Sequence, residues 1–343
     1  MTLAPHLNVA IVGCGAISKS HLPNMLKTPE MRVWATMDVI ESAARERAEQ
    51  GEAQYWTTNL DRVLSDDEVD AVAICATHDT HTELAVQAAE AGKHVFVEKP
   101  PAMTIEEARR LQRAAHETGV QMMSGWWFKH SPVTKRLRSV ITQPYSVLFT
   151  LREPGKAGQG PDGPDGPYGR DGLLDNAGYN LHWIWHVMRS QPVEVYAQGF
   201  DGKATNSCTT LIRFANGGLG TSVVSSVGSG GILPKHYAEV HAGPVSAATT
   251  RFYNLVFEGT DEPGIEENEY HNGFDEEMGM FARLCLEGGP NPMDMWEASV
   301  PTFLFEKAVE SMRARRPVPL DLEKEMYLPD GKLPTSIANF GDV

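Results

Sequence analysis

The sequence has few cysteines, no long apolar run and no basic leader. Its four cysteines are scattered and form no CxxC pair. This spacing argues against a disulfide framework and a thiolate metal site, so we expect reduced thiols, no metal and a cytoplasmic location. No apolar run approaches the roughly 18 residues of a membrane span. The N-terminus enters strand-like sequence without the basic segment of a signal peptide.

Basic residues are also in deficit. The chain has 30 Lys and Arg against 45 Asp and Glu, a net charge of -15, which repels phosphate backbones and anionic headgroups. We therefore expect neither a nucleic acid nor a membrane surface as a partner. The 41% of apolar and 22% of charged residues are typical of a globular protein. A length of 343 residues suits two domains.

Residues 1–125 alternate short apolar runs with helical stretches. Strands that lack polar alternation and are separated by helices predict a parallel sheet covered on both faces. This part of the chain is therefore expected to form a doubly wound α/β domain. The expected strands are residues 8–12, 32–37, 70–76, 94–97 and 120–123, and the expected helices include residues 43–50, 81–92 and 104–119.

Residues 126–343 have a different texture. Long strand-like runs joined by turns, with a hairpin signal at Asn216-Gly217, predict an α+β domain with one large, mostly antiparallel sheet. The segment 153–172 is rich in Gly and Pro. It admits two interpretations, a surface loop or a lid over a ligand cleft. Helices are expected at about 132–141, 173–189, 274–286 and 302–315.

A glycine motif follows the first predicted strand. "NVAIVGCGAISKSHL" places Gly13, Gly15 and Ser18 as GxGxxS between a strand and a helix. The first glycine permits a tight turn, the second lets the backbone approach a pyrophosphate, and Ser18 is small enough for close helix packing. We expect the diphosphate of a dinucleotide at this helix N-terminus, next to Ala16 and Ile17.

Asp38 lies at the end of the second predicted strand, twenty residues after Ser18. Its carboxylate is expected to accept hydrogen bonds from ribose hydroxyls and to repel a 2′-phosphate. No arginine follows it in "DVIES". The sequence therefore favours NAD over NADP as the cofactor.

The glycine motif and the segment from Thr77 to Pro100, "THDTHTELAVQAAEAGKHVFVEKP", resemble the Gfo/Idh/MocA oxidoreductases. The resemblance implies a Rossmann domain followed by an open-faced sheet whose outer face forms homodimers or homotetramers. It also implies that a cleft between the domains holds a carbohydrate or polyol substrate against the nicotinamide.

The resemblance assigns roles to residues in this segment. The lysine of the family's EKP motif corresponds to Lys99, which would contact cofactor and substrate and act in catalysis beside Glu98. The family's loop next to the dinucleotide corresponds to Thr77, His78 and His81. The chemistry supports Lys99 independently, because oxidation of an alcohol removes a hydroxyl proton. Ligands also bind at the carboxyl ends of parallel strands.

The chain departs from the family's DxGxHxxD signature. An alignment without gaps places Asn176, Asn180 and Trp183 at its aspartate, histidine and last aspartate. We favour this register because it needs no gap. Its amides would bind sugar hydroxyls but cannot accept a proton at neutral pH, so Lys99 would be the evident base.

A second register starts from Asp175 and gives Tyr179 and His182. With His186 these residues form one narrow helical stripe, about 100° away from the first register's stripe. Here Tyr179 would relay the proton and His182 would bind substrate. A metal held by His182 and His186 lacks an evident third ligand, so we expect none.

The stretch "SGWWFKHSP" occupies the place of the family's "GfnrRfsP". Its aromatic residues are typical of a core or interface. Trp127 and His130 would alternatively line the sugar site, because aromatic rings pack against the C–H side of pyranoses.

The hypothesis is an NAD-dependent oxidoreductase that transfers a hydride between nicotinamide and a secondary alcohol or anomeric carbon of a sugar, cyclitol or related polyol. Two alternatives keep the fold. One is a glycosidase or epimerase-type enzyme that retains its NAD, and the other is a dinucleotide-sensing regulatory protein without catalysis.

Overall fold

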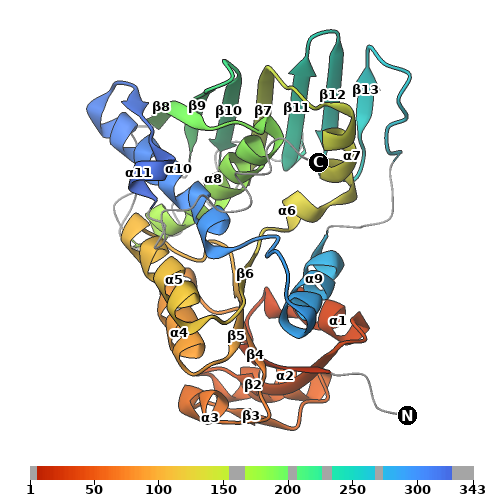
Figure 1. The fold of residues 1–343 in the computed structure, drawn as a ribbon, viewed down its shortest axis with the longest axis vertical. Helices are drawn as coiled ribbons and strands as arrows, with labels where there is room; N and C mark the ends of the chain where they lie inside the picture. Colours follow the sequence, from red (N-terminus) through yellow and green to blue (C-terminus); the bar gives the residue numbers. More distant parts are fainter. Residues whose placement is uncertain (1–5, 154–166, 200–206, 226–233, 267–272, 327–343) are drawn as a thin grey trace. The chain divides into compact units, whose positions relative to one another are not determined.

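The computed structural model describes residues 6–153, 167–199, 207–225, 234–266 and 273–326. These form two compact units. The first contains Met1–Trp127 and Gly273–Ser299, and the second contains Phe128–Asn272 and Val300–Tyr327. Each unit has its own sheet (Figure 1). The domain boundaries 1–125 and 126–343 stay a prediction.

The first unit is built on a six-stranded sheet in the order β3-β2-β1-β4-β5-β6. Every pair of neighbouring strands is parallel, and all four residues of β4 are buried. The predicted doubly wound parallel sheet is confirmed. The strands are β1 (Leu7–Val12), β2 (Met31–Met37), β3 (Tyr55–Thr57), β4 (Ala71–Ile74), β5 (His94–Glu98) and β6 (Met122–Gly125).

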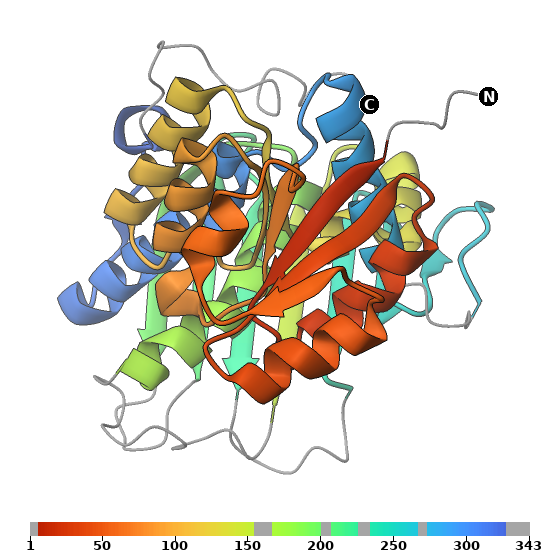
Figure 2. The same cartoon turned by 90° about the horizontal axis from the view of Figure 1, so that it is seen from below.

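Helices cover both faces of this sheet (Figures 1 and 2). Helices α1 (Ser18–Lys27), α2 (Glu41–Gln50) and α9 (Phe274–Glu287) lie on one face, and α4 (His78–Glu90) and α5 (Ile105–Thr118) lie on the other. A short helix, α3 (Leu60–Leu64), follows β3.

The local sequence explains where α5 begins and ends. The Thr104 side chain accepts from the Glu107 N–H while the Glu107 carboxylate accepts from the Thr104 N–H, which forms a capping box. Gly119 stops the helix with a φ of 71°.

The second unit is built on an eight-stranded sheet in the order β13-β12-β11-β7-β10-β9-β8-β14. Only β7 and β10 are parallel neighbours among these strands, so the predicted mostly antiparallel sheet is confirmed. The strands are β7 (Ser146–Arg152), β8 (Pro192–Gly199), β9 (Cys208–Phe214), β10 (Leu219–Ser225), β11 (His236–Ala242), β12 (Val245–Thr250), β13 (Val256–Glu258) and β14 (Val318–Pro319).

The predicted hairpin between β9 and β10 is confirmed. Gly217 has a φ of 84°, which an L side chain rarely adopts. The Phe214 N–H donates to the Gly218 carbonyl at 2.9 Å and closes the turn.

One face of the second sheet is covered by α8 (Pro167–Met188), which packs on β7 and β10. This helix begins earlier than the expected residue 173. Residues 154–166 of the Gly/Pro-rich segment, in which a loop or lid was predicted, lie outside the described residues. The remaining helices are α6 (Trp127–His130), α7 (Pro132–Val140), α10 (Met295–Ala314) and α11 (Leu322–Glu325). Within the described ranges, no helix is long and apolar enough to cross a membrane.

Candidate functional site

The turn after β1 contains two glycines, Gly13 and Gly15, whose surroundings differ. Gly13 has a φ of 90°, and its N–H donates to the Met37 carbonyl at 2.8 Å. A Cβ at Gly13 would lie 2.5 Å from the Ala76 nitrogen, whereas a Cβ at Gly15 would meet nothing within 4 Å. Gly13 therefore lets two backbone segments pack together, and the space beside Gly15 is open. The predicted binding of a diphosphate there stays a prediction.

Asp38 is held by hydrogen bonds to both carboxylate oxygens, one of them from the glycine turn. Oδ2 accepts from the Cys14 N–H at 2.7 Å, and Oδ1 accepts from the Ile40 N–H at 2.8 Å. The next two side chains, Val39 and Ile40, are 82% and 61% exposed. The carboxylate is thus a fixed hydrogen-bond acceptor followed by two uncharged, exposed side chains, and its predicted contact with a ribose stays a prediction.

The turn after β5 carries the predicted catalytic lysine. β5 ends at Glu98, and the Lys99–Pro100 peptide bond is cis. Lys99 is buried, and its backbone N–H donates to Glu98 Oε2 at 3.0 Å. Because β1, β4 and β5 are parallel in one sheet, this turn and the glycine turn lie at the same edge.

A buried histidine that the sequence analysis did not single out holds Glu98. His21 of α1 is fully buried and its Nε2 makes a short hydrogen bond with Glu98 Oε1. Burial of Glu98 raises its pKa, but the hydrogen bond from His21 and the charges of His21 and Lys99 outweigh burial and lower that pKa below its usual value. Glu98 is therefore ionised, and its carboxylate holds the backbone N–H of Lys99.

His81 supports the same turn from α4. Its Nδ1 lies 2.9 Å from the Pro100 carbonyl and its Nε2 lies 3.1 Å from the Ala76 carbonyl. Burial lowers its pKa, and a neutral ring carries one N–H to donate to either oxygen. Thr77 is exposed and His78 is half-buried, 5.5 Å from the His81 ring. The predicted contacts of these three residues with cofactor stay predictions.

A second group missing from the sequence analysis is Glu277 of α9. It is fully buried, and neither carboxylate oxygen has a hydrogen-bond partner among the described residues. Phe274, one helical turn earlier, packs its ring 5.1 Å from the ring of His21. Burial and then the charge of Glu98 raise the pKa of Glu277 well above its usual value. Burial and Glu98 thus favour the protonated form of Glu277.

In the second unit, the asparagine register of α8 faces its own sheet. The Asn180 amide donates to the Phe149 carbonyl and to Ser222 Oγ, both at 3.0 Å. Trp183 donates through Nε1 to Thr134 Oγ1 at 2.9 Å. Asn176 is buried as well. The Asn180 bonds join the helix to β7 and β10, and the Trp183 bond joins it to α7. A role of Asn176 and Asn180 in substrate binding or catalysis stays a prediction.

The other register lies along a different stripe. Tyr179 is half-buried, with its ring 4.7 Å from that of Phe128. His182 and His186 are buried, and their rings stack 6.1 Å apart. Burial, and then nearby cations, of which Arg138 is the strongest, lower the pKa of His186 well below its usual value. Asp175 lies within α8, but its side chain is outside the described set.

The residues suggested for the sugar site belong to different units. Trp127 is half-buried in the first unit and packs 5.5 Å from the ring of Phe274. His130 is buried in the second unit. Their contact with substrate stays a prediction. Among the described residues, no group of three or more His, Cys, Asp or Glu is placed to hold a metal.

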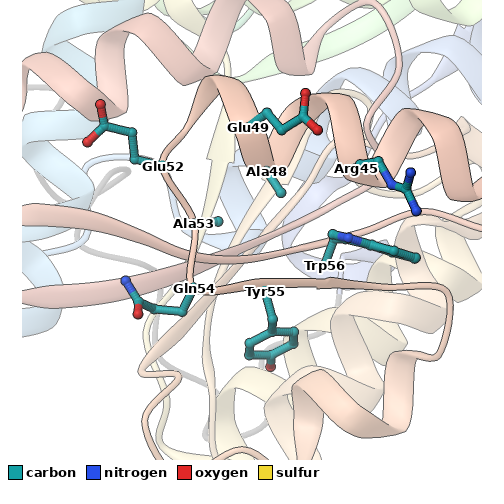
Figure 3. A pocket seen from close by; sticks show the side chains of 8 residues that line it. All are labelled: Arg45, Ala48, Glu49, Glu52, Ala53, Gln54, Tyr55 and Trp56. Carbon is teal, nitrogen blue, oxygen red and sulfur yellow. The ribbon is translucent and has the colours of Figure 1, made fainter.

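A hollow of about 480 Å³ lies away from these turns, beside α2 and β3 (Figure 3). Arg45 and Trp56 stand at one end of it and Glu52 at the other. None of the predicted site residues lines it. Its position at the outer edge of the first unit's sheet separates it from the glycine and lysine turns.

Comparison with known proteins agrees with this geometry. Residues 7–126 match the model of the oxidoreductase family GFO_IDH_MocA, NAD-binding Rossmann fold. The uncharacterized oxidoreductase YrbE of Bacillus subtilis is 27% identical over 55% of this chain. The match spans 56% of YrbE, about half of that relative's length. The myo-inositol 2-dehydrogenase of Thermotoga maritima is 24% identical over 92% of this chain and 99% of its own.

The fold is also that of solved structures. Levoglucosan dehydrogenase, in complex with NADH and levoglucosan, superposes with a TM-score of 0.82 at 19% identity, covering 92% of this chain and 99% of its own. The glycine turn, the Glu98-Lys99-Pro100 turn and the match over residues 7–126 agree with one another. Residues 7–126, which carry both turns, thus match the NAD-binding Rossmann model of the GFO_IDH_MocA oxidoreductases, and nearly the whole chain is similar to a myo-inositol 2-dehydrogenase.

Proposed function

We propose that this protein is an NAD-dependent oxidoreductase that transfers a hydride between nicotinamide and a secondary alcohol or anomeric carbon of a sugar, cyclitol or related polyol. The observation that carries the proposal is the meeting of the glycine turn and the Lys99 turn at one edge of the same parallel sheet. The inositol and levoglucosan dehydrogenases among the similar proteins support the substrate class.

The chain's own groups divide the work. Gly13 and Gly15 shape the turn for the diphosphate, and Asp38 accepts from the ribose. Lys99 takes or polarises the proton of the reacting hydroxyl, and Glu98, its neighbour in the chain, holds a negative charge. When bound, the nicotinamide supplies the hydride chemistry.

We propose NAD rather than NADP because of the surroundings of Asp38. Its carboxylate is fixed by two backbone N–H groups, and the side chains of Val39 and Ile40 offer no positive charge to a 2′-phosphate.

Steady-state oxidation of a panel of inositols and pyranoses, with NAD and with NADP, tests both proposals. We expect NADH formation on at least one substrate, with kcat/KM at least about tenfold higher for NAD than for NADP. Turnover without net NADH would instead support the cofactor-retaining glycosidase or epimerase. Dinucleotide binding without turnover on any substrate would support the regulatory alternative.

We also propose a homodimer or homotetramer through the second unit's sheet. Alternate residues of β9 are exposed on the face away from α8. Among them Leu211 pairs across the strands with Tyr196, and these side chains are 40% and 37% exposed. Light scattering of the purified protein is expected to give at least twice the mass of 37.7 kDa, and a monomer would contradict this proposal. A cytoplasmic location, which cell fractionation tests, stays a prediction.

A further inference from the structure

Arg47 is a buried cation behind the glycine turn. It lies on α2 and is only 2% exposed. Its guanidinium donates through Nε to Ser18 Oγ at 3.1 Å and through Nη2 to the Cys14 carbonyl at 3.3 Å. A third, short hydrogen bond joins Nη1 to Gln50 Oε1. These contacts place a positive charge against the backbone of the turn.

None of these partners is an anion. Within the described part of the chain, no carboxylate oxygen lies within 4.0 Å of the Arg47 guanidinium. A buried charge without a counter-ion costs free energy, because burial removes its hydration without a compensating ion pair. A bound anion near the turn would offset this cost.

Two peptide groups link Arg47 to the open side of the turn. The Cys14 carbonyl accepts from Arg47, and the Gly15 carbonyl accepts from Ser18 Oγ at 2.7 Å. In a trans peptide the C=O and the N–H point in opposite directions. The Gly15 N–H, in the peptide of the Cys14 carbonyl, therefore points away from Arg47, and the Ala16 N–H, in the peptide of the Gly15 carbonyl, points away from the Ser18 hydroxyl. Hydrogen bonds to the two carbonyls polarise both peptides and strengthen those N–H groups as donors.

The charge of Arg47 acts on the thiol of Cys14 in this turn. Burial, and then the charge of Asp38, raise the pKa of the Cys14 thiol to about 12, while the charge of Arg47 acts to lower it. The carboxylate of Asp38 holds the Cys14 N–H and Arg47 holds its carbonyl. Asp38 and Arg47 thus hold the two backbone polar groups of Cys14, its N–H and its carbonyl.

We propose that Arg47 is a positioning residue for the diphosphate of the dinucleotide, acting through Ser18 and the peptides of Cys14 and Gly15 rather than by direct contact. The proposal rests on the proposed function, because it requires that a dinucleotide binds at this turn. Ser18, which stands where the motif has its third glycine, is the link between Arg47 and the Gly15 carbonyl.

Calorimetric titration with NADH, ADP and adenosine tests the proposal, because adenosine lacks the diphosphate. Arg47→Gln is expected to weaken NADH and ADP about tenfold, the scale of a charge-assisted interaction, and to leave adenosine within about twofold. Arg47→Lys, which keeps the charge, is expected to stay within about threefold of the wild type for ADP. Ser18→Ala keeps the charge but removes the link, and is expected to weaken ADP about threefold.

The matched control is Arg45→Gln on the same helix, where an exposed arginine pairs with Glu41. It is expected to change none of the three affinities. Equal ADP affinity in Arg47→Gln and the wild type, or a loss of adenosine in the same proportion as ADP, would overturn the role of Arg47. If Arg47→Gln does not fold, unchanged ADP binding by Ser18→Ala overturns it. A wild-type chain that binds neither NADH nor ADP would overturn the proposed function as well. The wild-type titration alone therefore distinguishes failure of the proposed function from failure of the role of Arg47.

Discussion

Lys99→Met is expected to lower turnover at least about 10²-fold while the enzyme still binds NADH within a few-fold of the wild type. Methionine keeps much of the lysine stem but can neither accept nor donate the proton of the reacting hydroxyl. The site of the lysine is preformed, because Glu98 holds its backbone N–H and His21 holds Glu98. Steady-state kinetics on the best panel substrate, together with NADH titration, measure the two effects separately.

The control is Lys27→Met, an exposed lysine at the end of α1, which is expected to leave kcat unchanged. Full turnover by Lys99→Met would refute the catalytic role of Lys99 and leave the proposal of dinucleotide binding unaffected.

The same assay on Tyr179→Phe separates the two registers of α8. If Tyr179 relays the proton, its loss changes the pH profile of kcat, whereas the asparagine register predicts an unchanged profile.

The parts of the fold that depend on local signals are predictable from the sequence. The glycine turn, the capped helix after Thr104 and the hairpin at Asn216-Gly217 each follow from a few adjacent residues. Strand β3 was not predicted, because three residues are too few to show periodicity.

Three polar residues near the candidate site were not predicted. His21 and Arg47 are far in sequence from the turns they support, and Glu277 is far in sequence from Glu98, whose charge acts on it. Each occupies a buried position on a helix whose other buried side chains are mostly apolar, as Arg47 does between Ala44 and Ala48. A polar residue in the apolar stripe of a helix indicates a buried polar group, and this pattern is visible in the sequence. Its hydrogen-bond partner is not, because that partner depends on how distant segments pack.

The orientation of α8 could not be derived for the same reason. Asn180 and Tyr179 are adjacent in sequence, and either register gives a consistent polar stripe. Asn180 donates to the Phe149 carbonyl and to Ser222 Oγ, and these acceptors lie on strands 31 and 42 residues away in the sequence. Only the packed sheet determines which stripe is turned towards it.

Glu277→Gln is expected to stabilise the protein increasingly as the pH rises. The folded-state pKa of Glu277 is raised well above its ordinary value of 4.5, by burial and by the charge of Glu98. Between these two pKa values the folded state binds a proton that the unfolded state has released, so wild-type stability falls with rising pH. The slope is about 1.4 kcal/mol per pH unit. Glutamine carries no titrating proton and removes this contribution.

Urea unfolding of Glu277→Gln and wild type at several pH values measures the difference. We expect the free energy of unfolding of the variant, relative to that of the wild type, to increase as the pH rises from the ordinary value of 4.5 towards the raised folded-state pKa. Glu276→Gln is the matched control. Glu276 is the neighbouring residue, and its side chain is only half-buried. A variant difference that stays constant with pH would show that Glu277 releases its proton in the folded state. Two negative charges would then lie buried near His21, and the single ionised carboxylate assigned to Glu98 would be wrong.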